Sequence, residues 1–263
     1  MCSSDLAQLP ALVADLLTGR VPPRMRQPAA DPILLVGASA GGVTAFRKLL
    51  SQPDVVPDMP IVLLLHRRRR SIHRGERLSA ILRASTNREV RIPEDGEEPM
   101  PGVVYLPRDQ HHLLLKQGRF GHEADCGDGE WCPSIDTLFG SAARSYGPRT
   151  IAALLTGRLS DGVQGLRDVT AYGGITIVQT PSDAESPSLP IAAIEGDHPN
   201  YLVPVHDLMN LLREISLVPF PRGVAADSLA LRCARAAAEA RERVRGHRGT
   251  TVRVQADLDD RND

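Results

Sequence analysis

The 263-residue sequence has no excess of either charge, no cysteine framework and no long apolar run. A formal net charge of −1 argues against a protein whose main partner is nucleic acid or an anionic membrane surface. No stretch approaches 18 uncharged apolar residues and no signal peptide is recognisable, so neither export nor membrane insertion is predicted. The cysteines lack the spacing of a zinc site or a secreted disulfide scaffold, and reduced thiols in the cytoplasm are expected for Cys2, Cys126, Cys132 and Cys233.

Short β-branched and leucine-rich runs alternate with helical patterns through most of the chain. Unbroken apolar runs are typical of strands buried on both faces of a parallel sheet, and they occur at Ile33–Val36, Ile61–Leu65, Val103–Leu106, Ile151–Leu155 and Ile175–Val178. Helices are predicted at Val43–Ser51, His73–Arg83, Ser134–Tyr146, Gly162–Tyr172 and Val205–Ile215. The alternation predicts an α/β fold, a doubly wound and mostly parallel sheet with helices on both faces.

The ends of the chain differ from this central pattern. Residues 1–30 are expected to form an N-terminal helical extension and linker, residues 31–220 the α/β domain, and residues 221–263 a C-terminal helix and disordered tail. A short polar turn separates Val103–Leu106 from His112–Lys116, which predicts an antiparallel hairpin at the sheet edge.

Ser39 lies in the segment Gly37-Ala38-Ser39-Ala40-Gly41-Gly42, between a predicted strand and a predicted helix. The small residues around it indicate a tight turn that exposes the serine hydroxyl at the carboxyl edge of the sheet. Amides of the next helical turn could hold a developing oxyanion there. Two alternatives are a serine that only caps the helix and a dinucleotide-binding loop. The second is disfavoured because the spacing is G-x-x-x-G-G and the next strand ends at a histidine.

His66 and Asp161 also follow predicted strands directly or in the loop that leaves them. An imidazole near Ser39 could accept its proton, and a carboxylate could orient that imidazole. Taken singly, His66 could be a solvent-exposed strand end and Asp161 the N-cap of the helix beginning at Gly162. A serine, a histidine and an aspartate that follow three separate predicted strands favour a serine esterase with a Ser39–His66–Asp161 triad.

The sequence resembles the catalytic domain of the CheB family of chemotaxis receptor methylesterases from about Ile33 to Ile215. The motifs that carry the likeness follow the order of the family: GASAGG at 37–42, the strand ending in His66, EDGEEPMPGVVYLPRDQHH at 94–112, CPSID at 132–136, LLTGRLSDGVQG at 154–165 and PIAAI at 190–194. The resemblance implies Ser39 as nucleophile, His66 as base and Asp161 as its orienting acid. It also places Ala40, Gly41, Arg158 and Arg67 around the oxyanion site and substrate rim.

By this resemblance the protein removes methyl esters from glutamate side chains of a signalling protein such as a chemoreceptor, with a further glutamine deamidase activity. It needs no metal and no organic cofactor, and no nucleic acid partner is implied. Family members of the chemotaxis pathway carry a receiver domain, which about 30 residues cannot hold, so gating by a receiver in cis is not expected.

Two segments depart from the family pattern. Arg158-Leu159 stands where the family has a Met-Gly turn, and Arg67–Arg70 replaces an apolar, proline-containing loop. The four arginines are either a solvated loop or a docking site for an acidic protein. The alternative function is therefore a catalytically weak module that binds a signalling partner through the cleft and the arginine loop; a nucleotide-binding oxidoreductase is a third possibility.

Overall fold

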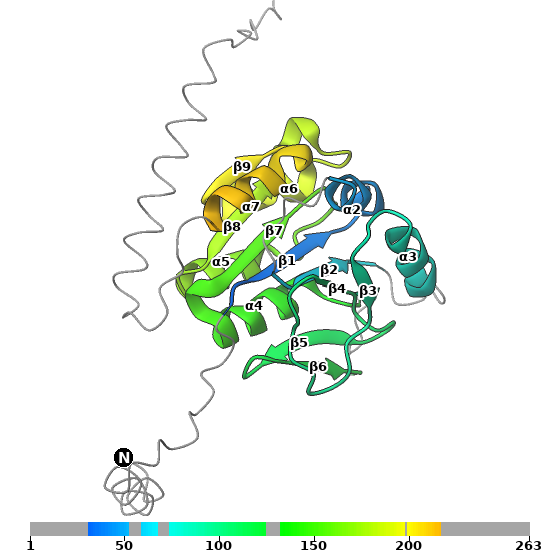
Figure 1. The fold of residues 1–263 in the computed structure, drawn as a ribbon. Coiled ribbons are helices and arrows are strands. Elements are labelled where there is room, and N and C mark those ends of the chain that lie inside the picture. The colour runs from blue at the N-terminus through cyan, green and yellow to red at the C-terminus, as the bar shows by residue number, and fades with distance from the viewer. Residues whose placement is uncertain (1–30, 53–58, 68–73, 125–131, 198, 217–263) are drawn as a thin grey trace, which may run out of the picture.

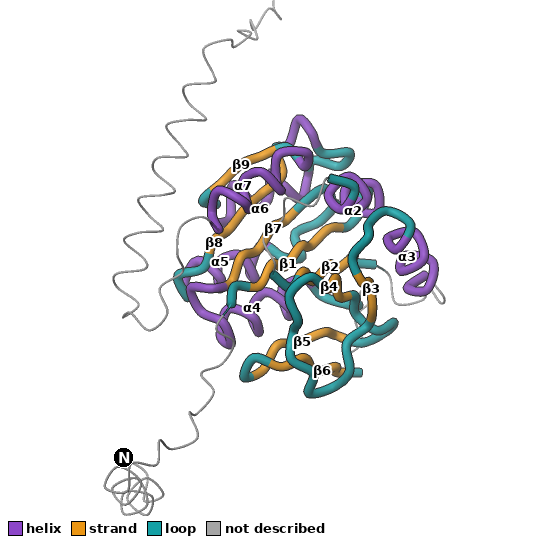
Figure 2. Tube along the Cα trace, viewed as in Figure 1, coloured by secondary structure: helices purple, strands orange, loops and turns teal. Residues whose placement is uncertain are grey.

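A computed structural model describes residues 31–52, 59–67, 74–124, 132–197 and 199–216 of the chain. These residues form a parallel sheet covered by helices on both faces (Figure 1), and strands and helices alternate in the tube view (Figure 2). The strands are β1 (Ile33–Ala38), β2 (Ile61–Leu65), β3 (Glu89–Arg91), β4 (Val103–Tyr105), β5 (His112–Lys116), β6 (Arg119–Glu123), β7 (Thr150–Leu154), β8 (Ile175–Gln179) and β9 (Tyr201–Val203). The α-helices are α2 (Gly42–Leu50), α3 (Arg74–Arg83), α4 (Ile135–Tyr146), α5 (Val163–Ala171), α6 (Ser188–Asp197) and α7 (Leu208–Ser216).

The main sheet has seven strands in the order β3-β4-β2-β1-β7-β8-β9, and every pairing in it is parallel. The chain leaves β1 toward β2 on one side and later returns to its other side with β7. In open α/β sheets, ligands bind outside the carboxyl ends of strands where the order reverses in this way. The doubly wound fold is confirmed, and its switch point lies at β1.

Two apolar layers sandwich the sheet, and alternate residues of β1 contribute to each. Leu34 and Val36 pack in the layer that holds the buried faces of α2, α3 and α7. Ile33 and Leu35 pack in the layer formed with α4, α5 and α6. All six residues of β1 are buried, as expected for the central strand of such a sheet.

The predicted hairpin exists, but its partner strand was wrongly assigned. Val103–Tyr105 is fully buried and pairs in parallel with β2 and β3. β5 pairs instead with β6, through a tight turn in which Gln117 and Gly118 both have positive φ (51° and 78°). Such a two-residue turn matches the twist of an antiparallel pair. The hairpin is a separate two-stranded sheet that packs its apolar face against α4 (Figure 1).

Some of the predicted segments and cysteines lie outside the described residues. The predicted segments 1–30 and 221–263 lie outside the described residues, so the domain boundaries stay predictions. None of the described helices has the length and apolar character that crossing a membrane requires. The expectation of reduced thiols is wrong for Cys132, which is buried and disulfide-bonded. The other three cysteines lie outside the described residues.

Candidate active site

Ser39 and His66 lie next to each other at the carboxyl edge of the sheet. The parallel register pairs Ala38 with Leu65, and these two residues immediately precede the serine and the histidine. The ladder continues for one more bond, in which the His66 amide donates to the Ala38 carbonyl at 2.8 Å. Neighbouring strands lie about 4.8 Å apart, so the two side chains start from adjacent backbone positions. The prediction that His66 follows a strand adjacent to β1 is confirmed.

The alternation of the strands directs both side chains toward the α4 face. Gly37, two residues before Ser39, faces α4 so closely that a Cβ there would lie 2.6 Å from Cγ2 of Ile135. Leu64, two residues before His66, packs in the layer that contains α4. His66 lies beside Asp161 at the start of α4. Because side chains two residues apart in a strand share a face, the same face is expected for Ser39.

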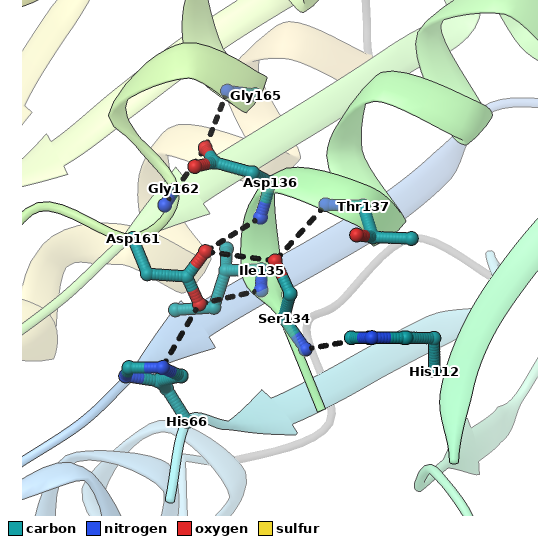
Figure 3. Close-up of polar contacts among 9 residues, drawn as sticks. All are labelled: His66, His112, Ser134, Ile135, Asp136, Thr137, Asp161, Gly162 and Gly165. Carbon is teal, nitrogen blue, oxygen red and sulfur yellow. Dashed lines mark hydrogen bonds and ion pairs between the residues drawn. The ribbon is translucent and has the colours of Figure 1, made fainter. Parts of the chain in front are cut away.

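Asp161 reaches the same place from the loop between β7 and α5. Its Oδ2 atom lies 3.5 Å from Nε2 of His66 (Figure 3). The carboxylate also accepts hydrogen bonds from the Ser134 hydroxyl (2.9 Å) and from the amides of Ile135 (2.7 Å) and Asp136 (3.1 Å). Three donors at the N-terminus of α4 therefore fix the carboxylate that faces the imidazole.

The alternative reading of Asp161 as the cap of its own helix is wrong. The N-cap of α5 is Gly162, with φ of 105° and no side-chain hydrogen bond. Asp161 instead binds the first amides of the neighbouring helix α4. A carboxylate in the first turn of a neighbouring helix is stabilised by that helix's dipole and amides.

Burial keeps the imidazole in its neutral form. His66 is only 7% exposed, and this burial lowers the pKa of His66 below its ordinary value, whereas the Asp161 carboxylate acts in the opposite direction. Desolvation is the larger effect, so the net direction is downward. A neutral imidazole at neutral pH is what a general base requires.

The turn after β1 is fixed by Thr156, in the loop that follows β7. The Ser39 amide donates to the Thr156 carbonyl (3.0 Å), and the Thr156 hydroxyl donates to the Ala40 carbonyl (3.0 Å). Gly41 has φ of 80°, a conformation that glycine adopts without strain. Gly157 approaches the serine so closely that a Cβ there would lie 2.9 Å from Cβ of Ser39.

The two predicted rim arginines differ in their surroundings. Arg158 is exposed beside Leu159, a residue with φ of 68°. Arg67 is mostly buried and forms an ion pair with Asp109. Its charge is thus already matched within the molecule. Arg68–Arg70 lie outside the described residues, so a docking role for the arginine loop stays a prediction.

Among the described residues, no group of three or more His, Cys, Asp or Glu side chains is arranged to hold a metal ion. The adjacent histidines His111 and His112, at the start of β5, have separate partners. Nδ1 of His111 lies 2.8 Å from the Asp109 carbonyl, whereas Nδ1 of His112 accepts the Ser134 amide at 3.1 Å.

Sequence reasoning missed the residues that hold Asp161. Ser134 was predicted only as a helix start, and Asp136 and His112 were given no part in the site. Figure 3 shows Ser134 and Asp136 at the start of α4 beside Asp161, and His112 beside the Ser134 amide. The signal available was the CPSID motif at 132–136, which places two polar side chains and a helix start together.

Comparison with known proteins decides the family. The model of the family described as CheB methylesterase matches residues 34–212, which include β1 from its second residue, the strand before His66 and the loop of Asp161. The chain belongs to the CheB methylesterase family. A crystal structure of the Thermotoga maritima CheB methylesterase catalytic domain superposes with a TM-score of 0.66 at 28% identity, covering 71% of this chain and 100% of that one.

Two similar CheB relatives differ in length. A Leptospira interrogans protein, provisionally named a protein-glutamate methylesterase/protein-glutamine glutaminase, is 32% identical over 68% of this chain and 91% of its own length. The protein-glutamate methylesterase/protein-glutamine glutaminase 2 of Pseudomonas syringae is 34% identical over 66% of this chain. The match spans 52% of that relative, about half of its length.

Proposed function

We propose that this protein is a serine hydrolase that removes methyl esters from glutamate side chains of a signalling protein such as a chemoreceptor. The observation that carries the proposal is the Asp161 carboxylate facing Nε2 of His66 at the sheet edge where Ser39 follows β1. The names of the relatives support glutamate methyl esters as the substrate class and glutamine side-chain amides as a second one.

In the proposed reaction the two ring nitrogens of His66 have different roles. Because Nε2 of His66 faces Asp161, Nδ1 is the atom that takes the proton from the Ser39 hydroxyl as its oxygen attacks the ester carbonyl carbon. The Asp161 carboxylate stabilises the resulting imidazolium. When the tetrahedral intermediate collapses, the carbon–oxygen bond to the methoxy group breaks and the imidazolium proton leaves with it as methanol.

The second half of the reaction uses the same groups. Water attacks the acyl-serine ester and gives its proton to the imidazole, and collapse returns that proton to the Ser39 oxygen and releases glutamate. We assign the oxyanion to the amides of the turn at Ala40 and Gly41, because the Ser39 amide already donates to Thr156 and the Gly42 amide donates to the Ser39 carbonyl at 2.9 Å. Arg158, exposed beside this turn, lies at the substrate rim.

The binding-module alternative draws no support from Arg67, whose charge is paired with Asp109. A serine-directed fluorophosphonate separates the two functions. The esterase predicts stoichiometric labelling of wild-type protein at Ser39, which disappears in Ser39→Ala and His66→Ala, together with methanol release from a methylated chemoreceptor. Methanol release that persists in Ser39→Ala, or absence of both labelling and methanol in the wild type, would overturn the proposal.

A further inference from the structure

The N-termini of α4 and α5 are capped by each other's carboxylates. Asp136, in the first turn of α4, accepts hydrogen bonds at Oδ1 from the amides of Gly162 (2.9 Å) and Gly165 (2.7 Å) at the start of α5. Asp161, just before α5, accepts the amides of Ile135 and Asp136 at the start of α4. Each helix thus begins on a carboxylate from the other (Figure 3).

This exchange fixes Asp161 from two directions. Its side chain is held by α4, and the next residue, Gly162, is held by the Asp136 carboxylate. Close packing leaves little room for a different arrangement. A Cβ on Gly162 would lie 2.8 Å from Cγ2 of Ile135, and a Cβ on Gly165 would lie 3.1 Å from Cα of Asp136.

The capping carboxylate is held in an unfavourable electrostatic environment. Burial, and then the nearby negative charge of Asp161, raise the pKa of Asp136, and the amides of Gly165 and Gly162 act against this rise. Two carboxylates so close together are tolerated where each is compensated by helix N-terminal amides. Asp136 thus contacts the Asp161 loop twice: its amide donates to the Asp161 carboxylate, and its carboxylate accepts the Gly162 amide.

We propose that Asp136 is a positioning residue, which holds the Asp161 loop so that the Asp161 carboxylate faces Nε2 of His66. It acts through Asp161 and contacts neither substrate nor the reacting atoms. This inference rests on the proposed esterase function and adds a residue to it. Groups that orient a functional side chain typically change activity by about 10- to 100-fold when removed, and small displacements of reacting groups have effects of similar size.

Two substitutions at this position separate positioning from charge. Asp136→Asn keeps an acceptor oxygen for the Gly162 and Gly165 amides, and its NH₂ group can face Asp161 as a donor. We expect its kcat on a peptide with a glutamate γ-methyl ester, and its fluorophosphonate labelling rate, to stay within about 3-fold of wild type. Asp136→Ala removes the acceptor, so kcat and labelling rate should fall by about 10- to 100-fold with KM within about 2-fold.

Loss of helix caps also lowers stability, and a control must separate this effect. The Asn200 side chain accepts the Thr176 amide at 2.8 Å, near the amino end of β8 and thus at the opposite edge of the sheet. Asn200→Ala therefore removes a comparable hydrogen bond without touching the site, and its kcat should equal that of wild type. If Asp136→Ala does not fold, Asp136→Ser retains a shorter acceptor and should show a kcat below that of the asparagine variant.

Three results would overturn this inference: wild-type kcat in Asp136→Ala or Asp136→Ser, an equal loss in Asp136→Asn and Asp136→Ala, or an equal loss in Asp136→Ala and Asn200→Ala. Fluorophosphonate labelling of Ser39 in the wild type shows whether only the role of Asp136 fails or whether the proposed esterase function fails as well. A labelled wild type with an equally fast Asp136→Ala overturns the role of Asp136 alone. An unlabelled, inactive wild type overturns both.

Discussion

Oδ2 of Asp161 lies 3.5 Å from Nε2 of His66 and is the same oxygen that accepts the Ile135 amide at 2.7 Å. One carboxylate oxygen therefore serves both the imidazole and the first turn of α4. The base of the proposed reaction is oriented by a group that is itself part of the helix framework. Substitution of this aspartate must consequently affect both turnover and folding stability.

Asp161→Asn should lower both kcat and the free energy of unfolding. The neutral amide cannot stabilise the imidazolium, so kcat should fall by about 100- to 10,000-fold. Its NH₂ group meets the hydroxyl and amide donors of α4, and the free energy of unfolding should fall by about 1–3 kcal/mol. Ester hydrolysis and urea denaturation measure the two effects. Asp168→Asn, in the middle of α5, is the control with unchanged kcat. Full turnover in Asp161→Asn would reduce Asp161 to a helix cap.

Stability should depend on pH through His66. Because burial lowers the pKa of His66 from its ordinary 6.5, the unfolded chain takes up this proton at a higher pH than the folded chain. The free energy of unfolding should therefore decrease as pH falls below 6.5, whereas His66 contributes no pH dependence above that value. Urea denaturation at several pH values should show a weaker decrease in His66→Gln than in wild type.

The same shift sets the acid limb of activity. The imidazole must be neutral to accept the Ser39 proton, so kcat/KM should stay constant as pH falls from 7 and then decline with a midpoint below 6.5. A midpoint above 6.5 would show that the Asp161 charge outweighs desolvation.

Gly157→Ala should damage the nucleophile turn. The added Cβ would lie 2.5 Å from Cδ2 of the buried Leu189 and 2.9 Å from Cβ of Ser39. Overpacking of this kind lowers the free energy of unfolding by about 1–3 kcal/mol, and displacement of Ser39 should lower kcat as well. Gly121→Ala is the matched control, because a Cβ there meets no heavy atom within 4 Å. Equal effects of the two substitutions would contradict the steric argument.

The sequence allowed the central strands, and the placement of Ser39 and His66 after neighbouring strands, to be predicted. β1, β7 and β8 are buried along their lengths and β2 along all but its last residue, so unbroken apolar runs identify them. Edge strand β3 is only three residues long with a single buried side chain, Val90, and carries no such pattern. Helix α6 was missed because Pro187 and Pro190 suggest a loop. Pro190 in fact lies in the first turn, where its missing N–H is not needed.

The capping of α4 by Asp161 could not be predicted from the sequence, for a different reason. A carboxylate before a glycine and a helix predicts a local cap, and local patterns cannot show that α4 passes close enough to take it instead. The small residues Gly37 and Gly162 permit that approach, since both leave space for the side chain of Ile135. The packing of α4 against α5 therefore decides that Asp161 caps α4, although its local sequence favours a cap on α5.

Leu159→Gly should stabilise the protein. Leu159 has φ of 68° and is 58% exposed, at the position where the family pattern has glycine. A left-handed conformation costs a non-glycine residue about 1–2 kcal/mol, and the greater freedom of glycine in the unfolded chain offsets about half of this. The free energy of unfolding should thus rise by up to about 1 kcal/mol in urea denaturation, with kcat unchanged because glycine keeps the same loop conformation. Leu159→Ala removes the exposed side chain but retains the strain, so it should give no gain. An equal gain in both variants would assign the effect to the exposed leucine and leave the backbone conformation of this loop unstrained.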